Sequence, residues 1–323
     1  MSLKGAVACI KNNKHFLVTS HLNLEGDALG SEIAFYRLLE KMGKYAVIVN
    51  EDDLPYEYSF LGSKARIIKF KRDLKGIKFD CFAILDCSNL KRCGEVGTLN
   101  KRDKPVLNID HHISNESFGN INWVDPAASS TAEMIYKLYK RLGVSVDKEA
   151  ALCLYVGILT DTGSFRYPNT TSRAHKIVSE LLRYKFDLAK VYQNVYENIP
   201  FPEMQLLISI LPHLKLQNEG KVAWLQIRQG LLKAKKSSFD LSEYILGFAR
   251  AIKGVEVVVL FKENLGAKDE IRVNLRSQGK VDVNRIARLF GGGGHKTASG
   301  ATVHGKIEEV RRKVLAKIRE SLG

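Results

Sequence analysis

"SHLNLEGDALGS", residues 20–31, follows the apolar run "HFLVTS" (15–20) and leads into a segment with helical spacing. A continuously apolar run is typical of a strand covered on both faces, so the stretch is predicted to form the turn between a strand and a helix. It places His21, Glu25 and Asp27 within seven positions. A single polar residue in such a turn usually caps a helix, but an imidazole with two carboxylates indicates half of a metal site.

Three more apolar runs predict further strands: "KYAVIVN" (44–50), "FDCFAILD" (79–86) and "PVLNID" (105–110). Helical patterns lie between and after them, and one of these begins with a capping box from Ser130 to Glu133. Strands that alternate with helices predict an α/β fold with a doubly wound, mainly parallel sheet.

Polar residues follow the ends of these predicted strands. Asp86 ends the third strand, residues 110–112 (Asp-His-His) end the fourth, and Asp161 closes a later apolar segment in "GILTDTGSF". In doubly wound sheets, ligands bind at the carboxyl ends of the strands. We therefore expect these groups to meet His21 at one edge of the sheet.

The length of 323 residues exceeds what one hydrophobic core usually serves, so two domains are expected. The first is predicted to span residues 1–185. A helical linker, 186–215, is predicted next, and its stretch "NIPFPEMQLL" (198–207) holds two of the seven prolines. A smaller α+β domain, 216–323, follows. Its predicted elements are a strand at 221–229, a helical stretch to about 253, β-runs at 255–261 and 271–277, a helix at 281–290, the segment "GGGGHKTASG", a short strand and a basic closing helix.

The chain carries a formal charge of +15, and residues 64–104 hold 12 Lys/Arg against 5 Asp/Glu. Such an excess favours a polyanionic partner, although a solvated basic face is the simpler explanation. The five cysteines form no C-x-x-C pair, and buried free thiols are the expected state. No membrane-spanning stretch or signal peptide is evident, so a cytoplasmic protein is expected.

Two imidazoles and four carboxylates are a ligand set between those of zinc and magnesium, and manganese is the natural compromise. Carboxylates that converge without cations would repel each other and raise each other's pKa values. Two metal ions bridged by a carboxylate would remove that repulsion and activate water against a phosphoryl group. The residues of the predicted set are His21, Glu25, Asp27, Asp86, His111 and Asp161.

The motifs "SHLNLEGDALGS", "AILDCSN", "NIDHH" and "GILTDTGSFRY", followed by "GGGGHKTASG", resemble those of the DHH-family phosphoesterases. The resemblance runs from about residue 15 to 302 and is greatest to the compact two-domain type. It implies a hydrolase that cleaves short oligoribonucleotides and removes the 3′-phosphate of 3′-phosphoadenosine-5′-phosphate. The expected partners are therefore short RNA oligonucleotides and 3′,5′-bisphosphonucleosides, with a second copy of the chain as a candidate partner.

The resemblance also implies ligand roles. His21, Glu25 and Asp86 would hold one Mn²⁺, with Mg²⁺ or Co²⁺ as alternative ions. Asp27, Asp86, His111 and Asp161 would hold the second, so that Asp86 bridges the pair. His112 would face the substrate as a phosphate contact or proton donor, and Asp110 would orient the neighbouring imidazole.

One motif departs from the family pattern at two positions: the family has "NPDGD" where this chain has "NLEGD". Glu25 reaches about 1.5 Å further than aspartate, and Leu24 leaves the turn freer to adjust. We expect a working first site with altered geometry or metal preference, and a weakened or inactive first site is the alternative.

The glycine segment lies inside the second domain, where a linker is not expected. Glycines there allow close backbone approach and can present N–H groups to an anion. By resemblance the second domain binds the substrate's phosphate and base, with Arg276 as a bidentate phosphate ligand. An edge-strand surface arginine is the alternative. The predicted substrate-binding residues are Arg276, Ser277, Gly292, Gly293, Gly294 and His295.

If the second domain holds a nucleotide by its 5′-phosphate, the scissile bond lies on that nucleotide's 3′ side. The alternatives are a phosphodiesterase of linear or cyclic dinucleotides, a pyrophosphatase or polyphosphatase, and a nucleotide- or RNA-binding module without turnover. The glycine-histidine segment favours a nucleotide over bare phosphate.

Overall fold

The computed structural model describes residues 2–61, 65–72, 74, 76–101, 103–230, 241–263 and 269–322. The chain divides into two compact units, Met1–Asn198 and Ile199–Gly323. The predicted linker, 186–215, falls across this division: α6 (Leu188–Tyr196) belongs to the first unit, whereas α7 (Phe201–Ile210) and η4 (Leu211–His213) belong to the second. The predicted limits at 185 and 216 stay predictions.

The first unit is built on a six-stranded sheet, parallel throughout, in the order β3-β2-β1-β4-β5-β6. The predicted α/β class is confirmed. The four predicted strands are present, and the two that were missed, β3 and β6, are too short to give a clear pattern. The strands are β1 (His15–Thr19), β2 (Tyr45–Asn50), β3 (Ile67–Lys69), β4 (Cys81–Leu85), β5 (Val106–Asp110) and β6 (Ile121–Val124).

The strand order reverses between β1 and β4, which are neighbours in the sheet but not in sequence. Chain segments leaving the carboxyl ends of these two strands turn in opposite directions along the sheet and leave a crevice for ligands. The predicted metal residues His21 and Asp86 follow β1 and β4 directly. The fold therefore places the start of the candidate site at the switch point.

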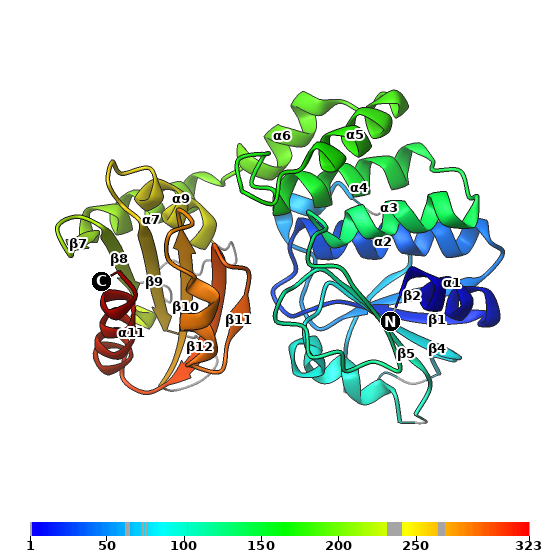
Figure 1. The fold of residues 1–323 in the computed structure, drawn as a ribbon, viewed down its shortest axis with the longest axis horizontal. Coiled ribbons are helices and arrows are strands. Elements are labelled where there is room, and N and C mark those ends of the chain that lie inside the picture. The colour runs from blue at the N-terminus through cyan, green and yellow to red at the C-terminus, as the bar shows by residue number, and fades with distance from the viewer. Residues whose placement is uncertain are drawn as a thin grey trace. The chain divides into compact units, whose positions relative to one another are not determined.

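Long helices cover one face of this sheet (Figure 1). They are α1 (Leu3–Asn12), α2 (Gly26–Lys41) and α3 (Thr131–Leu142), and α4 (Lys148–Asp161) packs on α2 and α3. Successive residues of a strand, such as Phe16 and Leu17 in β1, point to opposite faces of the sheet, and both are buried. Residues of η2 (Leu90–Leu99) and of the segment 68–79 pack on the other face. The unit also contains η1 (Tyr56–Tyr58), α5 (Ser172–Leu181) and η3 (Leu182–Tyr184).

The start of α3 matters for the site described below. The Ser130 hydroxyl accepts a hydrogen bond from the Glu133 N–H (3.1 Å), as the sequence predicts, and α3 ends at Gly143 with φ 69°. The Glu133 carboxylate, however, accepts from the N–H and hydroxyl of Ser129, at 3.0 and 2.8 Å. This capping fixes the first turn of α3 within the core.

The second unit contains a mixed sheet in the order β11-β12-β10-β9-β8-β7. Strands β8 and β9 are parallel and the other pairs are antiparallel, which confirms the α+β prediction. Residues 231–240 of the predicted helical stretch lie outside the described residues. The elements are β7 (Lys215–Gln217), β8 (Val222–Ile227), α9 (Ser242–Arg250), β9 (Val257–Glu263), β10 (Glu270–Ser277), α10 (Val283–Arg288), β11 (Gly293–Gly294), β12 (Ala298–His304) and α11 (Ile307–Leu322).

Helices cover both faces of the second sheet. Apolar residues of α10 and α11 pack on one face, and those of α7 and α9 pack on the other. Among the described residues, no helix combines the length and the apolar content needed to cross a bilayer.

Helix α2, which carries Asp27, packs closely against the backbone of α4 at Gly30. A Cβ at Gly30 would lie 2.4 Å from the carbonyl oxygen of Cys153. We expect Gly30→Ala to force the helices apart and destabilise the fold by about 1–3 kcal/mol, the usual cost of overpacking a core. Urea unfolding measures the loss.

Gly247→Ala in α9 is the matched control, because a Cβ there meets nothing within 4 Å. It should stabilise the protein by roughly 0.5–1 kcal/mol through helix propensity. Equal effects of the two substitutions would contradict the packing account.

Candidate metal centre

Imidazoles and carboxylates from separate segments meet beyond the carboxyl ends of β1, β4 and β5. Asp86 lies at their centre, fully buried and with a left-handed backbone at φ 52°. Its Oδ2 lies 3.4 Å from His21 Nε2, and its Oδ1 lies 3.5 Å from His111 Nε2 and 3.6 Å from His112 Nδ1. A non-glycine residue is rarely held at positive φ unless the surroundings require it, so this turn is built to place the carboxylate.

His111 joins a second set of acids to Asp86. Its Nε2 lies 3.7 Å from Asp27 Oδ2 and 3.5 Å from Asp161 Oδ2. Three sets of side chains in this unit each bring their ligand atoms within 4.8 Å of one another: His21–Glu25–Asp86, Asp27–Asp86–His111 and Asp86–Asp110–His112. Asp86 belongs to all three, and the first two consist of predicted metal residues. The six predicted metal residues are thus brought together.

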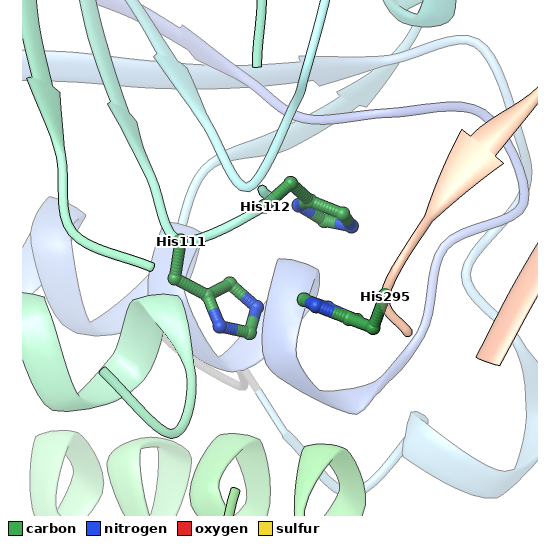
Figure 2. A group of neighbouring side chains, drawn as sticks. All are labelled: His111, His112 and His295. Carbon is green, nitrogen blue, oxygen red and sulfur yellow. The ribbon is translucent and has the colours of Figure 1, made fainter. Parts of the chain in front are cut away.

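The imidazole rings are oriented by backbone carbonyls. His21 Nδ1 lies 2.8 Å from the Leu22 oxygen, and His111 Nδ1 lies 3.3 Å from the Ala128 oxygen. A proton on Nδ1 in each case leaves Nε2 with a free lone pair facing the carboxylates, as metal-binding histidines require. Figure 2 shows the His111 and His112 rings on consecutive residues after β5. Both rings are buried.

The first turn of α3 holds two of the carboxylates. Asp27 Oδ2 accepts from the N–H of Thr131 (2.6 Å), and Asp27 Oδ1 accepts from the N–H of Ala132 (2.8 Å). The Thr131 hydroxyl donates to Asp86 Oδ1 at 2.9 Å. Backbone amides at a helix N-terminus favour negative charge, so α3 stabilises the acids before any cation is bound.

Charge in this cluster is not balanced by the protein. Burial and the nearby carboxylates of Asp86 and Asp161 raise the pKa of Asp27 well above its usual value. Burial also acts to raise the pKa of Asp86, but the nearby imidazoles of His21, His112 and His111 outweigh it and lower that pKa. Asp86 Oδ2 is buried without a hydrogen-bond donor. Such an oxygen, facing Nε2 lone pairs, fits a divalent cation.

Glu25 differs from the other acids of the set in its exposure. Its side chain is 48% exposed, whereas Asp27 and Asp86 are fully buried. Glu25 Oε1 lies 4.0 Å from His21 Nε2, and the carboxylate makes no capping hydrogen bond to α2, whose N-cap it occupies. The longer side chain therefore reaches the edge of the cluster from the solvent side.

His112 and Asp110 form a tight pair beside the cluster. His112 Nδ1 lies 2.7 Å from Asp110 Oδ1, which also accepts from the N–H groups of His111 and His112. Burial acts to raise the pKa of Asp110, but the His112 imidazole outweighs it and lowers the pKa to about 2. In His112 burial acts to lower the pKa, and the Asp110 carboxylate raises it overall. The pair is suited to holding a proton on His112.

In the second unit, Arg276 and Ser277 end β10 beside the glycine segment. Arg276 is paired with Ala298 across the strands, and the Ser277 N–H donates to the Thr297 oxygen at 2.8 Å. The Arg276 guanidinium forms an ion pair with Glu243. The structure thus brings Arg276, Ser277 and the loop before β12 side by side.

The glycines of this segment have a packing role. A Cβ at Gly292 would lie 2.1 Å from the Gly300 oxygen, and one at Gly294, with φ 139°, would lie 2.6 Å from the Ala298 oxygen. Gly293 and Gly294 pair with β12 as the short strand β11, and His295 follows them (Figure 2). Close approach of two strands therefore explains Gly292 and Gly294.

Three residues that touch the site were not singled out from the sequence. Thr131 belongs to the capping motif and was noted only as part of a helix start. The Asn169 amide donates to Asp161 Oδ2 at 3.2 Å and to the Ser129 oxygen at 2.9 Å. Glu32 lies one turn beyond Asp27 on α2, fully buried, and accepts from the Asn50 amide at 2.8 Å. No sequence pattern distinguishes an asparagine or glutamate with such contacts from a surface residue.

Glu32 is buried near the site, and the pH dependence of the free energy of unfolding tests whether burial raises its pKa. Burial raises its pKa to about 8, from an ordinary value of 4.5. The unfolded chain therefore loses this proton near pH 4.5 and the folded chain near pH 8, so the contribution of Glu32 to stability is present below pH 4.5 and is lost as the pH rises. We expect Glu32→Gln to gain stability over the wild type across this range, by at most about 1.4 kcal/mol per pH unit.

Urea unfolding of the metal-free protein at pH 5 and pH 8 checks this. Glu40→Gln, on the same helix and half exposed, is the control and should show no such trend. Parallel stability profiles of wild type and Glu32→Gln would show that Glu32 is not protonated in the fold.

Known proteins share this architecture. The model of the DHH family N-terminal domain matches residues 15–158, and that of the DHHA1 domain matches residues 234–322. The "bifunctional oligoribonuclease and PAP phosphatase NrnA" of Thermus thermophilus is 31% identical over 307 residues, which are 94% of this chain and 89% of the relative. A "probable" protein of the same name from Streptococcus mutans is 29% identical over 95% of both chains.

Among solved structures, an exopolyphosphatase-related protein from Bacteroides fragilis superimposes with a TM-score of 0.85 at 26% identity, covering 99% of this chain and 94% of that one. The sequence similarity spans both units and includes the segments that form the acid and imidazole cluster. The chain therefore belongs to the DHH family of metal-dependent phosphoesterases.

Proposed function

We propose that this protein uses two Mn²⁺ ions to hydrolyse short oligoribonucleotides to 5′-mononucleotides and to remove the 3′-phosphate of 3′-phosphoadenosine-5′-phosphate. The observation that carries the proposal is the position of Asp86 between two ligand sets, with His21 on one side and His111 on the other. The relatives named as oligoribonucleases and PAP phosphatases support the substrate class.

In the proposed centre, His21, Glu25 and Asp86 hold the first ion, and Asp27, Asp86, His111 and Asp161 hold the second. Manganese suits this set because it accepts both imidazole and carboxylate ligands. When bound, the ions offset the charge of the phosphoryl oxygens and acidify the attacking water. The buried carboxylates would hold the ions, and the carbonyl oxygens bonded to Nδ1 of His21 and His111 leave each Nε2 facing the carboxylates.

His112 is the proposed proton donor to the leaving oxygen. Asp110 accepts from its Nδ1 and stabilises the charged ring, so Nε2 carries the proton that the departing 3′-oxygen takes up. Water attack forms a new P–O bond, the bond to the 3′-oxygen breaks, and His112 becomes neutral. It regains a proton from solvent.

The second unit is proposed to bind the substrate's 5′-phosphate and base through the residues predicted from the sequence. Arg276 offers the planar, two-pronged donor that a phosphate prefers, and its pairing with Glu243 shows that it already holds a carboxylate. Ser277 follows Arg276 as the last residue of β10, and His295 lies in the adjoining loop. We also propose a cytoplasmic location, which the cysteine usage of the sequence favours.

A metal and substrate panel tests the function. Wild-type protein should cleave a 5′-phosphorylated dinucleotide and 3′-phosphoadenosine-5′-phosphate with Mn²⁺, and His111→Ala should lose at least about a hundredfold in kcat. Turnover of cyclic dinucleotides or pyrophosphate in preference to both would favour those alternative functions. Tight binding with no turnover under any metal would indicate a binding module.

The same panel tests Glu25. If the half-exposed carboxylate is an adapted ligand, Glu25→Asp should weaken Mn²⁺ binding by roughly tenfold, because the shorter side chain no longer spans the gap. Calorimetric Mn²⁺ titration measures this. Tighter binding or a sharp gain in activity would show instead that glutamate impairs the site.

If Arg276 binds the 5′-phosphate, the protein should distinguish dinucleotides that carry this phosphate from those that lack it. Wild-type protein should prefer a 5′-phosphorylated dinucleotide to its 5′-hydroxyl counterpart in kcat/KM, and Arg276→Ala should reduce that preference by roughly tenfold. Arg285→Ala is the control, since Arg285 is 88% exposed on α10 of the same unit. Equal rates of the wild type on both dinucleotides would contradict 5′-phosphate recognition.

A further inference from the structure

Asn115 lies half buried in the loop between β5 and β6. Its side-chain amide donates a hydrogen bond to Asp110, the partner of His112. Its Nδ2 lies 2.6 Å from Asp110 Oδ2, 2.9 Å from Asn108 Oδ1 and 3.2 Å from the Cys87 oxygen. An NH₂ group has two hydrogens, so the two shortest contacts satisfy it. The amide therefore joins the carboxylate of Asp110 to the strand beneath it.

The orientation of this amide is fixed by its other end. Asn115 Oδ1 accepts from the N–H of Ser117 at 2.7 Å, so the oxygen is committed away from Asp110. A flipped amide would place two oxygens against each other on one side and two N–H groups on the other. The loop itself thus directs the Asn115 NH₂ group towards Asp110.

Asn108 anchors Asn115 to the neighbouring strand. It is fully buried in β5, and its own NH₂ donates to the oxygens of Ile84 and Cys87, at 3.2 and 3.1 Å. Ile84 lies near the end of β4 and Cys87 lies two residues beyond it, so the two flank Leu85 and Asp86. The asparagines therefore connect the Asp110 carboxylate to the segment that carries Asp86.

The two oxygens of Asp110 have different partners. Oδ1 accepts from His112 Nδ1 and from two backbone N–H groups, whereas Oδ2 accepts from Asn115. A carboxylate held at both oxygens cannot rotate about its Cβ–Cγ bond, and the hydrogen-bonded ring of His112 is then fixed as well. Loss of the Asn115 donor would leave a buried, charged oxygen without this partner.

We propose that Asn115 is a positioning residue for leaving-group protonation. It fixes the Asp110 carboxylate, which holds His112 by Nδ1 and directs Nε2 at the leaving 3′-oxygen. The inference rests on the proposed function. In the step concerned, the water oxygen bonds to phosphorus, the P–O3′ bond breaks, O3′ takes the proton from His112 Nε2, and the proton lost by the water passes to solvent.

The test compares two dinucleotides that differ in one atom. In the second, sulfur replaces the leaving 3′-oxygen, and a thiolate departs without a proton. For Asn115→Ala with Mn²⁺, kcat on the oxygen substrate should fall by roughly ten- to a hundredfold, the range of a displaced general acid. On the sulfur substrate kcat should stay within about twofold of the wild type. The ratio of the two rates does not depend on the fraction of folded protein.

Asn122→Ala is the matched control. Asn122, in β6, bonds the oxygens of Gly119 and Ser117 in the same loop and has no recorded contact with Asp110. It should leave the ratio unchanged. Mn²⁺ binding, followed by electron paramagnetic resonance, should be the same in all three proteins.

If Asn115→Ala lowers kcat equally on both substrates, or weakens Mn²⁺ binding, Asn115 acts on the metal centre or on the fold. Either result would overturn the inference. No loss on either substrate would overturn it too. Failure of the wild type to cleave either dinucleotide would contradict the proposed function instead, so the two failures are distinguishable.

Discussion

The structure of the first unit depends on holding buried carboxylates close together at one edge of the parallel sheet. Asp27 and Asp86 are fully buried and share His111 as a neighbour. Charges so placed are costly unless they are paired and hydrogen-bonded. The protein supplies backbone N–H groups from α3, the Thr131 hydroxyl and three imidazoles, which lower the cost but do not remove it. A bound cation would complete the balance, and the family to which the chain belongs is metal-dependent.

The sheet topology explains why these groups meet. Strands β1 and β4 are neighbours at the point where the strand order reverses, so the turns after them leave in opposite directions. His21 follows one and Asp86 the other, and β5 brings in His111 from the next strand. The acids supplied by helices come from the starts or ends of α2 and α4, where the side chains reach the sheet edge. A parallel sheet thus brings together residues that lie far apart in sequence, such as His21 with Asp86 and Asp27 with His111.

The positions of several site residues were predictable from the sequence, because the ends of buried strands can be recognised there. Apolar runs followed by Asp or His identify the positions of Asp86 and His111, and parallel pairing then requires them to converge. The supporting residues had no such signal. Thr131, Asn115 and Asn169 act through contacts between segments far apart in sequence, and each also fits an ordinary cap or loop. The glycines near residue 292 were expected to approach a ligand, but two of them are required by the neighbouring strand β12. The short strands β3 and β6 depend on pairing rather than on a local pattern.

The proposed chemistry assigns distinct tasks to adjacent residues of one loop. His111 turns Nε2 towards the carboxylates, and His112 is held by Asp110 through Nδ1. The central claim is that Asp86 bridges two cations. Anomalous diffraction from crystals grown with Mn²⁺ tests it most directly. The account predicts two manganese peaks, about 3.5–4 Å apart, each bonded to the Asp86 carboxylate. A single peak, or manganese bound away from Asp86, would contradict it.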